Sequence, residues 1–112
     1  MSDKSPPNLG EFEQLVLLAV ARLGEDAYGA SVWNAIVEHS GRDVTLGAVY
    51  KTLMRLEGKG LLQSRMGEPT SRRGGRRKRV YELNPAGREA LERTLGALWR
   101  MARGLGFATG AS

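Results

Sequence analysis

Residues 11–23 constrain the fold of this 112-residue chain more than any other segment, because the helix they predict is apolar on nearly every side. The segment reads EFEQLVLLAVARL, and Gly24 is well placed to end it. A helix that is apolar nearly all round must be covered on more than one face. A single small domain can hardly cover both sides, so the segment predicts a core and also an interface with a second chain.

Two further helices are predicted before the first turn-rich region. The segment from Tyr28 to just before Gly41 carries an inward stripe at helical spacing, and Trp33 within it is interpreted as core rather than as a ligand contact. The segment 45–56 begins with Thr45, a good N-cap. Its expected inward residues, with Tyr50 and Met54 beside them, are Leu46, Val49, Leu53 and Leu56.

The opposite face of the segment 45–56 is small at its beginning and basic further along. Such a face suits a helix that enters the major groove of DNA, because small residues let the backbone approach while longer ones reach bases and phosphates. An ordinary amphipathic helix has a polar outer face too, and this face alone does not decide between the two. The candidate DNA contacts on this helix are Thr45, Gly47, Ala48, Tyr50, Lys51, Thr52 and Arg55.

Beyond Gly58 and Gly60 the pattern changes from helical to strand-like, over 61–66 and again over 79–83. Residues 65–79 carry a net charge of +6, whereas the rest of the chain carries −1. A solubilising loop is the alternative, but this concentration of charge favours contact with a polyanion. We therefore predict a hairpin with a basic tip, whose candidate DNA contacts are Arg72, Arg73, Arg76, Arg77, Lys78 and Arg79.

The last predicted helix, 85–105, starts with Asn84 as N-cap and Pro85 in its first turn. Its apolar residues recur at spacings of four and three, which is typical of a coiled-coil seam. We expect this seam to pair with a second chain, the alternative being that the helix folds back on its own domain. The predicted dimer interface comprises Phe12, Val16, Ala19, Leu91, Leu95, Leu98, Trp99 and Ala102, and the seam extends to Leu105.

Together these segments predict a mainly α fold with a two-stranded β wing: a winged helix-turn-helix plus a C-terminal dimerisation helix. The expected organisation is a disordered tail at 1–9, the winged-helix domain at 10–84, the dimerisation helix at 85–105 and a disordered tail at 106–112. The chain lacks cysteine, has one histidine, and offers no phosphate loop or paired carboxylates at useful spacing, so we expect no enzyme activity, metal or cofactor. Its apolar runs are too short to span a membrane, and a cytoplasmic protein is expected.

Three segments of the chain resemble the PadR-like family of bacterial transcriptional regulators. They are Tyr28-Gly29, the run TLGAVYKTLMRLEGKGL at 45–61, and the run RKRVYELNPAG at 77–87. The resemblance spans about Leu15 to Leu95, and the Gly-x-x-Tyr at 47–50 is its most typical part. The wing here is more basic than the family pattern suggests, and the single last helix resembles the short members of the family.

The resemblance implies a repressor that binds an inverted-repeat operator in double-stranded DNA as a homodimer and is released by a small-molecule effector. By position, Tyr50 would contact the DNA backbone, and the surface around Thr45 and Gly47 would abut it. Trp99 is the candidate effector contact, for a small aromatic molecule, although packing of the dimer is the favoured role. The alternative function is a basic winged-helix module for RNA or a protein partner; only Tyr50 and Tyr81 are expected as stacking platforms for RNA bases.

Overall fold

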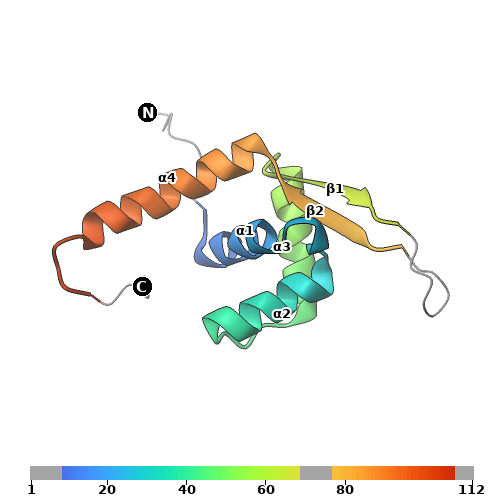
Figure 1. Ribbon diagram of the computed structural model, residues 1–112, viewed down its shortest axis with the longest axis horizontal. Coiled ribbons are helices and arrows are strands. Elements are labelled where there is room, and N and C mark those ends of the chain that lie inside the picture. Colours follow the sequence, from blue (N-terminus) through green and yellow to red (C-terminus); the bar gives the residue numbers. More distant parts are fainter. Residues whose placement is uncertain (1–8, 69–76, 108–112) are drawn as a thin grey trace.

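The computed structural model describes residues 9–68 and 77–107. Three helices, α1 (Glu11–Leu23), α2 (Gly29–Ser40) and α3 (Leu46–Gly58), precede a hairpin of β1 (Leu62–Met66) and β2 (Arg79–Leu83), and α4 (Pro85–Ala102) ends the fold (Figure 1). A short 3₁₀ turn, Gly24–Asp26, follows α1. This order is the winged-helix arrangement that the sequence predicted. None of the described helices is both long and apolar enough to cross a membrane.

Helix α1 lies at the centre of the core, with α2, α3, β2 and α4 packed around it. Val16 and Leu17 have no exposed surface, so the prediction that α1 is covered on more than one face is confirmed. The cover comes from the same chain, which corrects the assignment of Val16 and Ala19 to a dimer interface. Leu9 is buried too, and the predicted tail therefore ends before it.

The helix boundaries follow the predicted caps. Thr45 Oγ1 accepts a hydrogen bond from Ala48 N at 3.1 Å, and Asn84 Oδ1 accepts one from Gly87 N at 2.9 Å. Each cap satisfies a backbone donor that the first turn of its helix leaves without a partner. The C-terminal end of α1 is also as predicted: Gly24 follows its last residue and has a φ of 59°, a conformation that residues with a side chain rarely adopt.

The wing is anchored at its base by a backbone hydrogen bond to the turn after α1. β1 and β2 pair antiparallel, with Leu62 opposite Leu83 and Ser64 opposite Tyr81. Tyr81 N donates to Ala27 O at 2.7 Å, which ties β2 to the helical core. The Tyr81 side chain is only 3% exposed, so its predicted availability as a stacking platform is wrong: along β2 it is the residue that faces the core.

Helix α4 packs on the domain only through its first half. Figure 1 shows it running away from the other helices towards the C-terminal end. Leu91 is buried against the core of its own chain, which corrects its assignment to the dimer interface, whereas Leu95, Leu98 and Trp99 are exposed. The helix ends at Ala102 instead of reaching Leu105, and Gly104 follows with a φ of 86°.

The junction between α4 and β1 leaves no room for a side chain at Gly87. A Cβ there would overlap the carbonyl oxygen of Leu61, a backbone atom that also accepts a hydrogen bond from Asn84 N. Gly96, further along the same helix, would place a Cβ 3.3 Å from the flexible end of Arg100. The two glycines therefore offer a matched pair within one helix.

We predict that Gly87→Ala lowers the free energy of unfolding by about 1–3 kcal/mol, because α4 and β1 must move apart. Gly96→Ala is the control: it should be neutral or raise that free energy by up to about 1 kcal/mol through its better helix propensity. Urea denaturation followed by circular dichroism measures both. Equal effects of the two substitutions would contradict the tight junction.

Candidate nucleic-acid interface

Helix α3 presents an exposed face on which small, apolar and basic side chains alternate. Thr45, Gly47 and Lys51 are exposed as predicted, and Ala48 is partly so. Leu46, expected to face inward, is instead exposed, and Tyr50 and Met54 are exposed in the same row one turn apart. The face is therefore more apolar than the sequence analysis anticipated. The missed signal is the four-residue spacing of Leu46, Tyr50 and Met54.

Tyr50 stands against the beginning of α2. A Cβ at Gly29 would overlap the Tyr50 ring, so the ring lies directly on the glycine backbone. The residue is nevertheless 45% exposed. Gly29 thus allows close approach of α2 and α3, and Tyr50 is positioned by packing as well as by its own helix.

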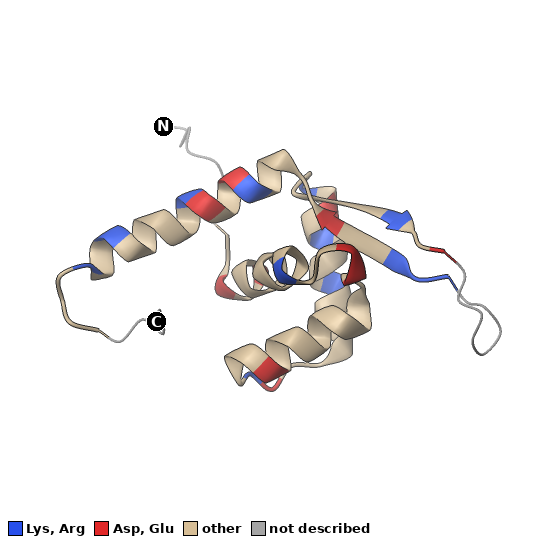
Figure 2. Cartoon of the chain, viewed as in Figure 1, with Lys and Arg blue, Asp and Glu red and all other residues tan. Residues whose placement is uncertain are grey.

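The end of the strand pair that leads to the wing tip adds three cations beside this surface, each with a neighbour in the protein. Arg77 Nε donates to Gly67 O at 3.1 Å, and Arg79 Nη1 donates to Ser64 Oγ at 3.0 Å. The Lys78 ammonium lies 3.9 Å from the centre of the Tyr28 ring, within reach of a cation–π interaction. Figure 2 shows basic residues on both strands where they lead towards the tip. The remaining wing candidates, Arg72, Arg73 and Arg76, lie outside the described residues.

Two residues assigned to the DNA-facing surface have other partners. Thr52 is only 3% exposed, and its hydroxyl accepts a hydrogen bond from Arg55 Nη2 at 3.4 Å, so it does not face outward. Arg55 Nε donates to Glu13 Oε2 at 3.1 Å across the helix pair. Arg55 therefore pairs with a carboxylate on α1, while its side chain stays 51% exposed, and its assignment as a DNA contact remains a prediction.

Glu13 is a buried acid that sequence reasoning missed. Its side chain is 8% exposed and receives Lys59 Nζ at 2.7 Å and Gly10 N at 2.9 Å in addition to Arg55. Burial by itself raises the pKa of Glu13, but the hydrogen bonds from Lys59, Gly10 and Arg55 outweigh it and lower the pKa to about 2. This acid therefore joins the beginning of α1 to the end of α3.

The second exposed surface is the outer half of α4. Leu95, Leu98 and Trp99 project from it, and Ala102 is partly exposed, as the predicted seam requires. Phe12 is partly buried against the core of its own chain. Three further large apolar residues that the sequence pattern did not single out are also exposed: Leu18 on α1, Met101 at the end of α4, and Phe107.

No group of three or more histidine, aspartate or glutamate side chains suited to a metal ion occurs among residues 9–68 and 77–107. The candidate site consists of α3 with its exposed face, α2, which precedes α3 and touches it at Gly29, and the cationic hairpin of β1 and β2. A protruding helix supplies groups for base edges, and a basic hairpin supplies groups for phosphates. This arrangement defines a DNA-binding winged-helix protein.

Comparisons with known proteins agree with this class and narrow it. The model of the transcriptional regulator PadR-like family matches residues 17–93. Transcriptional regulator Rv3488 of Mycobacterium tuberculosis is 40% identical over 78 residues, which are 70% of this chain and 68% of that protein. The chain belongs to the PadR-like family and is a transcriptional regulator rather than an enzyme.

Solved structures share the fold. A PadR family transcription regulator from Clostridium difficile R20291 has a TM-score of 0.68 at 25% identity, covering 86% of this chain and 94% of that one. The Aeropyrum pernix ORC1 protein, solved in complex with DNA, has a TM-score of 0.59 at 25% identity. It covers 80% of this chain but only 26% of the ORC1 chain, so the likeness concerns one part of that protein.

We predict that Glu13→Gln lowers the free energy of unfolding at pH 7 by about 2–3 kcal/mol, since two cations lose their partner. The folded-state pKa of Glu13 lies below its ordinary value of 4.5. Its contribution is therefore present above about pH 4.5 and is lost as the pH falls towards 2. Urea unfolding of both proteins from pH 7 to pH 3 should show the difference shrinking.

Glu11→Gln is the control for this experiment. Glu11 lies two residues earlier, is exposed, and pairs with Arg42 at the surface. An exposed pair of this kind contributes at most about 1 kcal/mol, so the control should change little at either pH. A Glu13→Gln difference that stays constant over this pH range would contradict the lowered pKa.

Proposed function

We propose that this regulator binds an inverted-repeat operator in double-stranded DNA as a homodimer, with α3 reading the sequence and the wing binding the backbone. The observation that carries the proposal is the exposed face of α3 beside the cations Arg77, Lys78 and Arg79 of the wing. The fold shared with ORC1, which was solved with DNA, supports it. We expect the homodimer to act as a repressor, as the family resemblance implies.

The composition of the exposed face of α3 supports its proposed role as the element that contacts the bases. Gly47 and Ala48 lack bulk at the helix beginning, which favours close approach to the floor of the major groove. Lys51 extends from the middle of the exposed face and is the proposed hydrogen-bond donor to a base edge. Leu46 and Met54 lie on either side along the helix and suit contact with thymine methyl groups.

The cations of the wing support a role in affinity more than in sequence preference. Arg77, Lys78 and Arg79 are all exposed, and a phosphate contact carries no base information. The tip candidates Arg72, Arg73 and Arg76 extend the same proposal. The burial of Tyr81 leaves Tyr50 alone of the two expected stacking platforms, which argues against the RNA alternative.

The homodimer is proposed from the outer half of α4. Leu98 is 57% exposed and Trp99 is 49% exposed, on a helix that extends beyond its own domain. Pairing with a second copy would remove these side chains from water, and it would place two α3 helices on one duplex. Trp99 then lies at the interface, where packing is its favoured role and contact with a small aromatic effector is the alternative.

The DNA proposal predicts a palindromic consensus when bound duplexes are selected from random DNA. Lys51→Ala should change the preferred base at one position in each half-site by about 1–3 kcal/mol. Lys78→Gln should preserve the consensus and flatten the log–log salt dependence of affinity by about 0.9 for each phosphate that the lysine no longer neutralises. Fluorescence anisotropy at several salt concentrations measures both.

Arg22→Gln provides the control, because it removes an exposed positive charge from the side of α1 that meets the end of α2. Its salt dependence should match that of the parent protein more closely than that of Lys78→Gln. If Lys51→Ala leaves every base preference unchanged, α3 is not the reader. Failure to enrich any duplex would overturn the DNA proposal as a whole.

The dimer proposal predicts that Leu98→Glu yields a monomer in sedimentation experiments, because a charge would be buried at the seam. Ala97→Glu introduces the same charge at an exposed neighbour on another side of the helix and should remain dimeric. Circular dichroism confirms that both variants are folded. A dimer that persists in Leu98→Glu would remove the outer half of α4 from the interface.

A further inference from the structure

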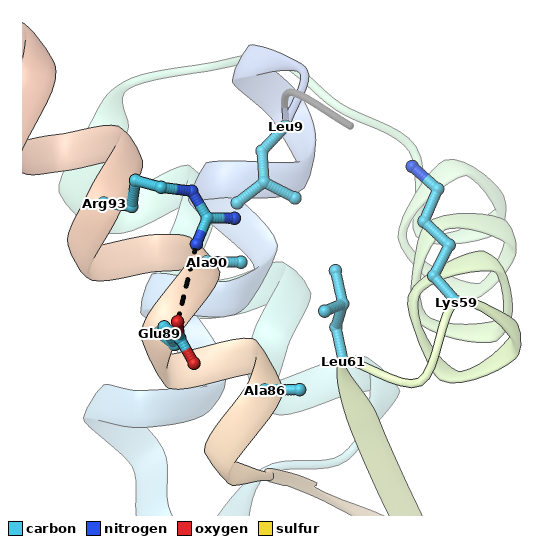
Figure 3. A pocket seen from close by; sticks show the side chains of 7 residues that line it. All are labelled: Leu9, Lys59, Leu61, Ala86, Glu89, Ala90 and Arg93. Atoms are coloured by element: carbon cyan, nitrogen blue, oxygen red, sulfur yellow. Dashed lines mark ion pairs between the residues drawn. The ribbon is translucent and has the colours of Figure 1, made fainter. Parts of the chain in front are cut away.

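A pocket of about 380 Å³ lies where α4 meets the beginning of α1 and the end of α3. Figure 3 shows its lining side chains, with Lys59 and Arg93 on opposite sides and Leu9 and Leu61 between them. Its volume falls within the range of about 300–1,000 Å³ typical of small-molecule sites. It lies on the first half of α4, whereas the proposed dimer seam occupies the second half.

The floor of this pocket is apolar. Leu9, just before α1, and Leu61, between α3 and β1, face the pocket, and Ala86 and Ala90 line it from α4. The small alanine side chains leave the space that larger residues on this helix would fill. An apolar body of a ligand therefore has a surface to cover, and its burial would supply most of the binding free energy.

Three charged side chains line the rim: the cations Lys59 and Arg93 and the carboxylate Glu89. The two cations differ in how closely each is paired with a carboxylate. Lys59 Nζ already lies 2.7 Å from Glu13 Oε2 and is occupied by that carboxylate. Arg93 Nη1 lies 3.9 Å from Glu89 Oε1, which exceeds a hydrogen-bond distance, and both side chains are exposed. Arg93 is therefore the group at the rim that can take a bidentate anion at small cost.

Hydrogen bonds and close packing fix the walls of the pocket. Asn84 Nδ2 donates to Gly60 O at 2.8 Å, and Gly87 lies against the Leu61 carbonyl, so α4 and the loop after α3 are joined. Gln14 Nε2 donates to Leu9 O at 3.1 Å and positions the third wall. A site whose walls are fixed in this way loses little conformational freedom when a ligand binds.

We propose that this pocket binds a small molecule with an apolar body and one anionic head group, which Arg93 anchors. The ligand class follows from the apolar floor and the cation at its edge. The molecule would lie along Leu9, Leu61 and Ala86, with its carboxylate or sulfonate on the Arg93 guanidinium.

Lys59 connects this pocket to α3, and this step rests on the proposed function. The same ammonium lines the pocket and binds Glu13, which in turn binds Arg55 on α3. The apolar body of a ligand anchored on Arg93 reaches across the pocket to the Lys59 side chain, and its packing there would shift the Lys59 ammonium relative to Glu13 and so perturb the junction that positions α3 on α1. Occupancy of the pocket should therefore weaken operator binding.

The test uses the full chain and 1-anilinonaphthalene-8-sulfonate, a fluorescent molecule with an aromatic body and one sulfonate. We expect saturable binding that Arg93→Gln weakens at least tenfold and that Ala86→Phe, which fills the pocket, abolishes. Arg100→Gln and Ala97→Phe repeat these substitutions on α4 outside the lining and should leave the affinity unchanged. Unfolding curves confirm that all four variants are folded.

Three results would overturn the proposal. If Arg93→Gln and Ala86→Phe bind the probe as tightly as their controls, the probe binds elsewhere on the protein. A loss of probe affinity seen only in Leu98→Glu would then place the probe on the outer half of α4. If Ala86→Phe converts a dimer into a monomer in sedimentation, a second copy of the chain covers the pocket. If decanoate, an aliphatic anion, fails to displace the probe, the site does not select for the proposed ligand class.

The link to α3 has a separate readout. The parent protein should lose operator affinity at least threefold when the probe is saturating, and Arg93→Gln should not respond at the same concentration. Because the fluorescence titration requires no DNA, binding of the probe without an effect on operator affinity contradicts the link alone. A chain that binds no operator would contradict the proposed function and leave the pocket supported by the titration.

Discussion

The burial of α1 is the constraint on which the rest of the structure depends. Thirteen residues form this helix, and two of its side chains, Val16 and Leu17, have no contact with solvent. Such a helix is stable only when other elements surround it, so α2, α3, β2 and α4 are arranged around one axis. The exposed face of α3 follows, because the side turned away from α1, α2 and β1 is the one on which its exposed residues lie.

The proposed DNA-binding surface is therefore positioned by close contacts on its inner side. Gly29 lets the Tyr50 ring lie on the backbone of α2, and Tyr81 N joins the wing to Ala27, just after the turn that follows α1. These two contacts connect α3 and the wing to the helical core. A frame of this kind would fix the distance between the proposed base-reading and phosphate-binding groups, which is what register on a duplex requires.

Local features of the sequence predicted the elements well. These features are local: the caps at Thr45 and Asn84 each bond a backbone N–H three residues later, so they fix the helix starts without help from the rest of the chain. The strand-like segments and the family-like run through α3 likewise depend on residues that are neighbours in the sequence. Side-chain direction depends on more distant partners. Arg55 looks like a free cation in the sequence, although its partner Glu13 lies 42 positions earlier. The burial of Val16 and Ala19 likewise depends on how closely the whole chain packs around α1. Thr52 is a different case: it lies three residues after Val49 and four before Leu56, so the helical spacing already placed it beside inward residues, and its polar side chain led to the wrong assignment.

The cluster around Glu13 has a consequence for how this sequence can vary. One carboxylate binds Arg55, Lys59 and the backbone of Gly10, so position 13 shares a single charge balance with two positions more than 40 residues later. Replacing the acid alone leaves two partly exposed cations without their partner, and replacing either cation alone leaves the acid with one partner fewer. Substitutions at these positions are therefore expected to be epistatic, and homologues that drift at position 13 should drift at 55 and 59 as well. The junction between α1 and α3 would then appear in an alignment as a covarying triplet.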